Sequence, residues 1–231
     1  MSLSSISIII PTLNEAEALP ATLAASRSAL PEAEVIVADG GSTDATVKIA
    51  LAHRAQVVFG PRGRGPQCRS GAAAARGDLL LFLHADTLLP PDAGRVLAEA
   101  FARSEMQIGT FRLSFDRPGP FLAACSWFTR FDSVFTRFGD QGITVRRAFH
   151  DELDGFAPWP LFEDVDFLRR ARSRTRVWSF PAEVRTSARR FRQHGPLRQQ
   201  LRNAVLLLRF LTGTKPESLA ASYKPEPTHA S

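Results

Sequence analysis

Two polar clusters and an acidic pair have residue types and spacings that could do chemistry. The first cluster, residues 39–44, reads Asp-Gly-Gly-Ser-Thr-Asp. Its small residues would let a ligand approach the backbone, and Asp39 offers acceptors for the N–H groups of a base or the hydroxyls of a ribose. The alternative is a tight turn with Asp44 near a helix start, and the segment by itself favours neither interpretation.

The second cluster, His84-Ala85-Asp86, follows an apolar run. Alternation in an extended segment points His84 and Asp86 to the same side, spaced to share a hard cation or a metal-bound diphosphate. A divalent ion there, Mg²⁺ or Mn²⁺, would stabilise a leaving diphosphate. The alternative is a polar strand end whose Asp86 caps the next helix. His194 is a candidate third metal ligand or phosphate contact, although a lone histidine is more often neither.

The acidic pair, Glu163-Asp164, begins a helical segment after an aromatic loop. A carboxylate at the mouth of a site is the residue type that a hydroxyl nucleophile needs as a general base. The alternative is that the pair only complements the helix dipole. Arg62, Arg64 and Arg69 flank a Gly- and Pro-rich loop and could bind phosphate oxygens, unless they are solvated surface arginines.

The elements that must position these groups alternate through the first 105 residues. Apolar, β-branched runs predict strands, and the segments between them predict helices. Right-handed crossovers then give an α/β fold, a mainly parallel sheet with helices on both faces, in which ligands bind beyond the carboxyl ends of the strands. The polar segments 12–15, 39–44 and 84–86 each follow a predicted strand and are expected to converge there. The predicted strands are 6–10, 34–38, 56–59 and 78–83, and the predicted helices are 15–30, 43 onward, 67–76 and 91–103.

The second half of the chain is less regular. Its pattern predicts strands at 107–115, 142–146, 176–180 and 183–187, and helices at 119–138, 163–171 and 196–211. We therefore expect one domain over residues 1–212, with a nucleotide-binding half (1–105) and an acceptor-side half (106–212). Residues 213–231 are expected to form a loose tail.

Composition narrows the class of protein. The chain has 231 residues, with 29 Lys and Arg against 23 Asp and Glu, and every charged residue between Glu183 and Glu217 is basic. That balance fits phosphates or an anionic membrane, and no nucleic-acid partner is expected. Two cysteines cannot make a disulfide framework, and no apolar run approaches the roughly 20 residues that span a bilayer. We expect a cytoplasmic protein, with peripheral membrane contact possible.

Taken in order, these segments resemble the inverting family 2 glycosyltransferases with the GT-A (Rossmann-like) fold. The matching segments are residues 11–15 (Pro-Thr-Leu-Asn-Glu), 39–44, 77–86 and 163–164. The resemblance implies that Asp39 pairs with the base, typically uracil, and that Asp164 is the catalytic base. It implies a divalent metal on Asp86. The donor-binding positions it implies are Pro11, Thr12, Leu13, Glu15, Asp39, Arg64, Ala85 and Asp86.

Residues 139–142 and 187–191 further look like a bacterial subgroup described as radical-SAM/selenodomain-associated transferases. The chain departs from the family pattern at His84, where an aspartate is usual, so the site has one negative charge fewer. The expected reaction moves a sugar from a nucleoside diphosphate, with UDP favoured, to a hydroxyl acceptor with inversion. The alternatives are a sugar nucleotidyltransferase, disfavoured because no Gly-rich loop with a lysine follows the first strand, and a non-catalytic nucleotide-sugar or membrane-binding module.

The predicted helix 119–138 carries many phenylalanines, and the segment 185–215 is basic. An apolar face beside a cationic one is what a protein needs to lie on an anionic bilayer and reach a lipid-linked hydroxyl. The alternative is that the phenylalanines pack against the sheet or a partner subunit while the arginines bind the donor phosphates.

Overall fold

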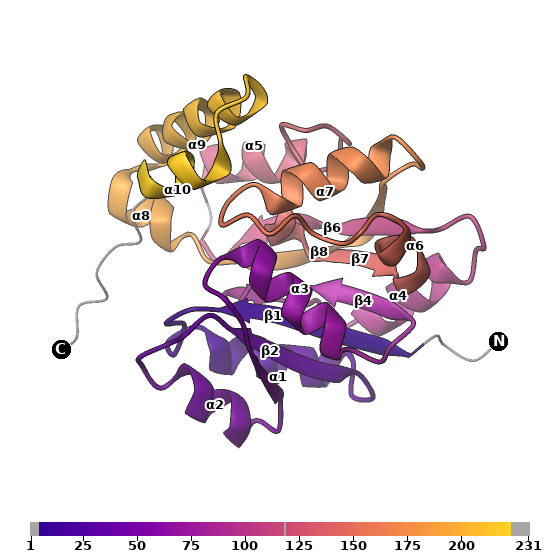
Figure 1. Ribbon diagram of the computed structural model, residues 1–231. Helices are drawn as coiled ribbons and strands as arrows, with labels where there is room; N and C mark the ends of the chain where they lie inside the picture. The colour runs from indigo at the N-terminus through magenta and orange to yellow at the C-terminus, as the bar shows by residue number, and fades with distance from the viewer. Residues whose placement is uncertain (1–4, 118, 223–231) are drawn as a thin grey trace.

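The computed structural model describes residues 5–117 and 119–222, apart from the side chains of residues 190, 193, 194 and 222. Within them the strands form one sheet in the order β3-β2-β1-β4-β7-β6-β8-β5 (Figure 1). The strands are β1 (Ile6–Thr12), β2 (Glu34–Asp39), β3 (Gln56–Phe59), β4 (Leu79–Phe82), β5 (Thr87–Leu88), β6 (Ile108–Phe115), β7 (Ile143–Arg146) and β8 (Trp178–Thr186). The expected α/β class and mixed, mainly parallel sheet are confirmed.

Helices cover both faces of this sheet (Figure 1). Ile8 and Ile10 of β1 pack with α1 and α4, whereas Ile9 points to the other face and packs with α3 and α7. This alternation explains why the β1 run is apolar throughout. The helices are α1 (Leu19–Ala29), α2 (Thr46–Ala52), α3 (Arg64–Ala74), α4 (Ala93–Phe101), α5 (Pro120–Phe128), α6 (Arg147–Glu152), α7 (Glu163–Arg172), α8 (Arg189–His194), α9 (Pro196–Leu211) and α10 (Pro216–Ser222).

The strand directions bring the polar segments to one edge. β1 pairs in parallel with β2 and β4, and β2 pairs in parallel with β3. β7 runs antiparallel to both β4 and β6, and β6 pairs in parallel with β8. The carboxyl ends of β1, β2, β4, β6 and β8 therefore lie at the same edge of the sheet, where α/β proteins bind ligands.

Two helices begin later than predicted because side-chain oxygens accept hydrogen bonds from backbone N–H groups near the predicted helix starts. The N–H groups of Glu15 and Ala16 donate to Thr46 Oγ1 (2.8 Å) and Asp44 Oδ2 (3.1 Å). Residues 15–18 accordingly form a turn before α1. Asp44 Oδ1 also accepts the N–H of Thr46 at 2.9 Å, which places the start of α2 at Thr46 and not at residue 43.

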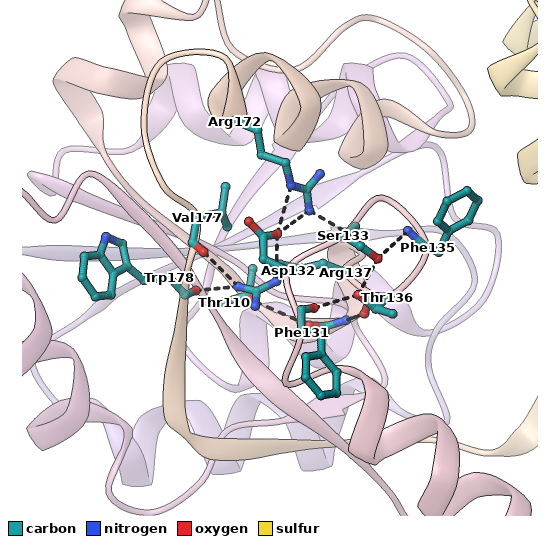
Figure 2. A network of polar contacts seen from close by, with 11 residues as sticks. Thr110, Phe131, Asp132, Ser133, Phe135, Thr136, Arg137, Arg172, Val177 and Trp178 are labelled. Carbon is teal, nitrogen blue, oxygen red and sulfur yellow. Dashed lines mark hydrogen bonds and ion pairs between the residues drawn. The ribbon is translucent and has the colours of Figure 1, made fainter.

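The predicted helix 119–138 is wrong beyond Phe128. Thr129 Oγ1 donates to the carbonyl of Ser126 (2.6 Å) and accepts the N–H of Leu113 (3.1 Å), which ends α5 against β6. The following loop is held by Arg137, which is 1% exposed and donates to the carbonyl of Trp178 at 2.7 Å (Figure 2). Arg137 Nε also lies 3.4 Å from Asp132 Oδ1, which accepts from Arg172 as well.

Aromatic residues of this segment are exposed and do not pack against the sheet. Trp127, Phe128, Phe131 and Phe135 are each exposed by about half or more of their surface. The interpretation that the phenylalanines fill the space against the sheet is therefore wrong for these side chains.

Other differences lie near the C-terminus. The two predicted strands 176–180 and 183–187 are one strand, β8, which continues past Pro181 with an irregular register opposite residues 110–112 of β6. Part of the predicted loose tail is the helix α10, and residues 223–231 lie outside the described part of the chain. Among the residues the structure describes, no helix is both long and apolar enough to cross a bilayer.

Candidate active site

Asp39 ends β2 and organises the turn that follows it. Its side chain accepts the N–H groups of Gly41 (2.9 Å) and Ser42 (2.8 Å) on Oδ1, and the hydroxyls of Thr12 (3.2 Å) and Ser42 (2.5 Å) on Oδ2. The residue is 1% exposed. A carboxylate has about four lone-pair sites, so a base that pairs with Asp39 must replace one of these donors.

The loop after β1 is tied to the same turn. Asn14 adopts a left-handed conformation (φ 55°), from which its Oδ1 accepts the N–H of Thr43 at 2.8 Å. Gln67 of α3 donates to the carbonyls of Thr12 (2.5 Å) and Ala38 (2.9 Å), so the ends of β1 and β2 and the helix α3 are held as one unit. Pro11, Thr12, Leu13 and Glu15, the donor-binding positions implied by the resemblance, lie in and directly after β1 within this unit.

A narrow recess joins the two halves of the molecule. It lies at the ends of β1 and β4, between α3 and α7, and brings together Arg64, His84 and Asp164, three of the predicted site residues. Its full lining is Pro11, Arg64, Cys68, Phe82, Leu83, His84, Gly139, Ile143, Phe156, Glu163 and Asp164.

Gly139 is the point where the recess is tightest. Asp164 Oδ2 accepts the N–H of Gly139 at 2.6 Å, and Asp164 Oδ1 accepts that of Val165 at 2.8 Å. A Cβ at position 139 would lie 3.0 Å from Asp164 Oδ2 and 3.1 Å from His84 Nε2. The absence of a side chain here therefore lets Asp164 and His84 approach the same point from α7 and from the end of β4.

Two further carboxyl groups lie in this region, of which Glu163 is buried and Asp140 is partly exposed, with its Oδ1 buried. Burial, together with the negative charges of Asp164 and Asp86, raises the pKa of Asp140 to about 7. Burial also raises the pKa of Glu163 to about 7, opposed by the positive charge of Arg64. Asp140 Oδ1 and Glu163 Oε2 are buried without a hydrogen-bond partner. The recess therefore concentrates carboxyl groups that lack sufficient compensating charge.

The arginines of the Gly- and Pro-rich loop have different surroundings. Arg64 is the first residue of α3, and its Nη1 lies 3.8 Å from Glu163 Oε1 in the recess. Arg69, in contrast, donates to the carbonyls of Asp154 (2.9 Å) and Phe156 (3.0 Å) and so positions the loop before α7. The phosphate contact proposed for Arg69 is not supported by this arrangement. Arg62 is exposed and does not line the recess.

The predicted metal ligands are only partly brought together. Thr22 Oγ1 donates to the carbonyl of Ala85 at 2.7 Å, and the N–H of Ser187 donates to that of Asp86 at 3.2 Å, so this segment is held from both sides. His84 lines the recess, and Asp86 lies close enough to raise the pKa of Asp140. His194 ends α8, and its side chain lies outside the described residues.

This region fits a divalent ion only if a bound ligand, such as a diphosphate, supplies part of the coordination. Within residues 5–117 and 119–222, no three His, Cys, Asp or Glu side chains are arranged to hold a metal by themselves. The partnerless oxygen of Asp140 and the nearby charges of Asp86 and Asp164 nevertheless form the negative potential that a cation would relieve. Mg²⁺ commonly binds through one or two carboxylates plus substrate phosphates, and the residues present fit that mode.

A second, open hollow of about 320 Å³ lies beyond β6 and β8 at the same sheet edge. Its charged lining residues are Arg117, Arg130 and Glu183, and its apolar wall comes from Leu122 and Trp127 of α5. Sequence patterns did not reveal this hollow, because the residues of 114–130 that line it are closed off by Glu183 of β8, a strand that pairs with β6 only in the folded chain.

Comparison with known proteins identifies the family. A sequence profile described as Glycosyl transferase family 2 matches residues 7–149. An uncharacterized glycosyltransferase of Mycobacterium tuberculosis is 34% identical over 116 residues, which make up 48% of this chain and 51% of that protein. An undecaprenyl-phosphate 4-deoxy-4-formamido-L-arabinose transferase of Pectobacterium carotovorum is 30% identical over 160 residues, 63% of this chain and 44% of that protein. The chain spans about half the length of the curated relatives it matches.

Solved structures share the fold. Glucosyl-3-phosphoglycerate synthase of Mycobacterium tuberculosis, in complex with Mn²⁺, UDP and phosphoglyceric acid, matches with a TM-score of 0.63 at 18% identity, covering 91% of this chain and 79% of that one. TarS of S. aureus in complex with UDP-GlcNAc matches with a TM-score of 0.63 at 20% identity, covering 79% and 58%. With the profile extending over more than half of its length, this chain belongs to glycosyl transferase family 2.

Proposed function

We propose that the chain transfers a glycosyl group from a nucleoside diphosphate donor, with UDP favoured, to a hydroxyl acceptor with inversion at the anomeric carbon. The observation that carries this proposal is the recess in which Asp164, His84 and Arg64 meet at the carboxyl ends of β1 and β4. Family membership supports the reaction class, and the related structures that hold UDP or UDP-GlcNAc support the choice of nucleotide.

The donor occupies the first half of the chain, residues 1–105, and the acceptor approaches over residues 106–212. The base lies near Asp39 and the Gly41–Ser42 turn, with Pro11, Thr12, Leu13 and Glu15 of the neighbouring loop beside it. Arg64 then lies where a guanidinium group can bind the diphosphate. This arrangement is consistent with the position of the loops at one sheet edge.

Asp164 accepts the proton of the acceptor hydroxyl while the oxygen attacks the anomeric carbon from the face opposite the diphosphate. The N–H groups of Gly139 and Val165 orient its two oxygens. Each oxygen has a second lone pair with which to accept that proton. Asp140, with a pKa near 7, is the competing base.

A divalent ion held by Asp86 and the donor phosphates would supply charge stabilisation for the departing diphosphate. His84 replaces one carboxylate of the usual pair, so its imidazole contributes a neutral ligand or a contact to the donor. His194 stays a predicted further ligand. The positive charge of Arg64 acts on the same leaving group and lessens the demand on the ion.

The acceptor is expected to reach Asp164 past the hollow beside α5, whose arginines and apolar wall suit an amphipathic hydroxyl compound that carries a negative charge. The family profile makes the nucleotidyltransferase alternative less favourable. Placement in the radical-SAM/selenodomain-associated subgroup stays a prediction that depends on residues 139–142 and 187–191.

Donor hydrolysis by the purified chain tests the proposal. Each nucleoside diphosphate sugar is incubated with the protein, and release of the nucleotide is measured with and without Mn²⁺. We expect release from a UDP-sugar that depends on Asp164. Absence of binding and release with every donor would instead favour the non-catalytic alternative.

A further inference from the structure

Helix α9 has two apolar faces, of which only one is covered by the residues that the structure describes. Leu206, Leu207 and Phe210 point inward, and Leu206 packs with Leu161 and with Leu219 of α10. On the outward side five apolar side chains remain exposed by 39–71%: Leu197, Leu201, Val205, Leu208 and Leu211. At about 100° per residue these five fall within an arc of about 120°, so they form one continuous stripe along the helix.

Charge accompanies this outward stripe on one flank. Arg198, Arg202 and Arg209 lie about 100–140° around the helix from Leu197, directly beside the apolar arc. Arg198 and Arg209 are exposed. The helix contains no acidic residue, and neither does any other position between Glu183 and Glu217. An apolar stripe bordered by arginines is the pattern of helices that lie in the plane of an anionic membrane surface.

The inward face of α9 holds the loop that leads to the catalytic carboxylate. Phe210 stacks on Phe162, with ring centroids 4.9 Å apart, and contacts Trp159 edge-on at 6.0 Å. Phe162 is the residue immediately before Glu163 and Asp164, and it adopts a left-handed conformation (φ 63°). The helix whose outer face is apolar thus packs directly on the loop that positions Asp164.

We propose that α9 binds the surface of an anionic lipid bilayer, with the outward stripe inserted among the acyl chains and the flanking arginines at the lipid phosphates. The charge of the helix favours this occupant over a second copy of the chain, because two such helices would bring arginines of the same sign together. Docking of α9 holds the loop before Asp164 near the membrane surface, where a lipid-linked or membrane-bound hydroxyl would meet the site. Only this last consequence rests on the proposed function.

The test is co-sedimentation of the purified full chain with vesicles of phosphatidylcholine, with and without phosphatidylglycerol. We expect binding that requires phosphatidylglycerol and weakens as salt is raised.

The double substitution Leu201→Glu and Leu208→Glu should lower the partition coefficient by roughly 100-fold, because two leucines no longer insert. Arg198→Gln with Arg209→Gln should lower it by about tenfold. Leu51→Glu is the matched control, since Leu51 of α2 is 59% exposed and lies outside α9.

Circular dichroism and binding of UDP are measured on each variant, so that a misfolded protein or a failure of the proposed function is distinguished from loss of membrane binding. The proposal is overturned if the native chain stays in solution at low salt with phosphatidylglycerol in excess. Equal binding by native chain and Leu201/Leu208 variant would also overturn it. So would a native dimer that the leucine substitutions convert to a monomer in light scattering, because the stripe would then be an interface between copies.

Discussion

Asp164 is the proposed catalytic base, and Asp140 is the alternative because both approach Gly139, one through a hydrogen bond to its N–H and the other as its neighbour in the chain. Asp164→Asn keeps the size of the side chain and removes its basicity. We expect turnover to fall by roughly 10²–10⁴-fold, with the Kd of the donor little changed. Single-turnover rates and calorimetric binding measure the two quantities. If Asp140→Asn shows this loss while Asp164→Asn remains active, Asp140 is the base.

Asp140 also links stability to pH. Its pKa is 3.8 in an unfolded chain and about 7 when folded, so between these values only the folded protein holds the proton. Stability therefore falls as pH rises from about 4 to about 7, and the penalty is complete above this window. Asp140→Asn removes the charge and should raise Tm by several degrees at pH of about 8, a difference that should vanish near pH 4.

The control for this pH effect is Asp154→Asn, because the side chain of Asp154 is 96% exposed and a left-handed position (φ 56°) suits asparagine. Its Tm should follow that of the native chain at every pH. An Asp140→Asn protein whose Tm difference is the same at both ends of the range would show that the burial of Asp140 carries no charge penalty.

Asp86 is the proposed carboxylate ligand of a divalent ion. Asp86→Ala should remove any increase in UDP affinity that Mn²⁺ or Mg²⁺ produces, because a hard ion needs that carboxylate oxygen. Titration calorimetry with UDP, in the presence of the ion and of a chelator, measures this. Asp92→Ala on the surface of α4 serves as the control and should retain the increase. Should a chelator leave UDP binding of the native chain intact, arginines alone hold the diphosphate.

At the scale of elements, a buried cation links the loop after α5 to its neighbours. Arg137 donates to the carbonyl of Trp178 and pairs with Asp132, which also binds Arg172 of α7 (Figure 2). Burial lowers the pKa of the Arg137 guanidinium, with the charge of Asp132 opposing the shift. The network joins residues 129–138 to β8 and α7.

Arg137→Met should therefore destabilise the protein by about 2 kcal/mol or more, since two carbonyls lose a charged donor and become buried without a partner. Tm should fall by roughly 4–8 °C, and limited proteolysis should begin within residues 129–138. Arg95→Met is the matched control, because Arg95 is 61% exposed and pairs only on the surface of α4. A Tm for Arg137→Met equal to that of Arg95→Met would show that the network does not hold the loop.

The sequence predicted the central strands within one or two residues because each is an apolar run that helices cover on both faces, as with Ile9 and its neighbours in β1. It also predicted that residues 12–15, 39–44 and 84–86 share one sheet edge, whereas the approach of Asp164 to this edge was not predicted from the pattern. Helix limits were less predictable, because Thr129 and Asp44 end or delay a helix through bonds to distant segments. The positions of Asp140 and Gln67 depend on such contacts too, and the pattern of neighbouring residues carries no signal for them.

At the scale of the whole molecule, the parallel strands and α7 meet at one edge, and α9 packs on the loop before Asp164. A ligand bound at this edge touches segments that are more than 100 residues apart in the chain, from the loop after β1 to α7. Such a ligand links the two halves and should stabilise the fold as a unit.

This linkage gives a test of the preferred nucleotide. A ligand present at 100 times its Kd stabilises the folded state by about 2.7 kcal/mol, which corresponds to a rise in Tm of roughly 5–10 °C for a chain of this size. If Asp39 and the neighbouring turn select uracil, UDP should raise Tm more than GDP, CDP or ADP at the same concentration. Thermal unfolding with each nucleotide, at one fixed concentration of Mn²⁺, makes the comparison. UMP serves as the control for the base alone and should give a smaller rise, because it lacks the second phosphate that Arg64 is expected to bind. A larger rise with GDP would contradict the choice of uridine while leaving the family and the recess unchanged.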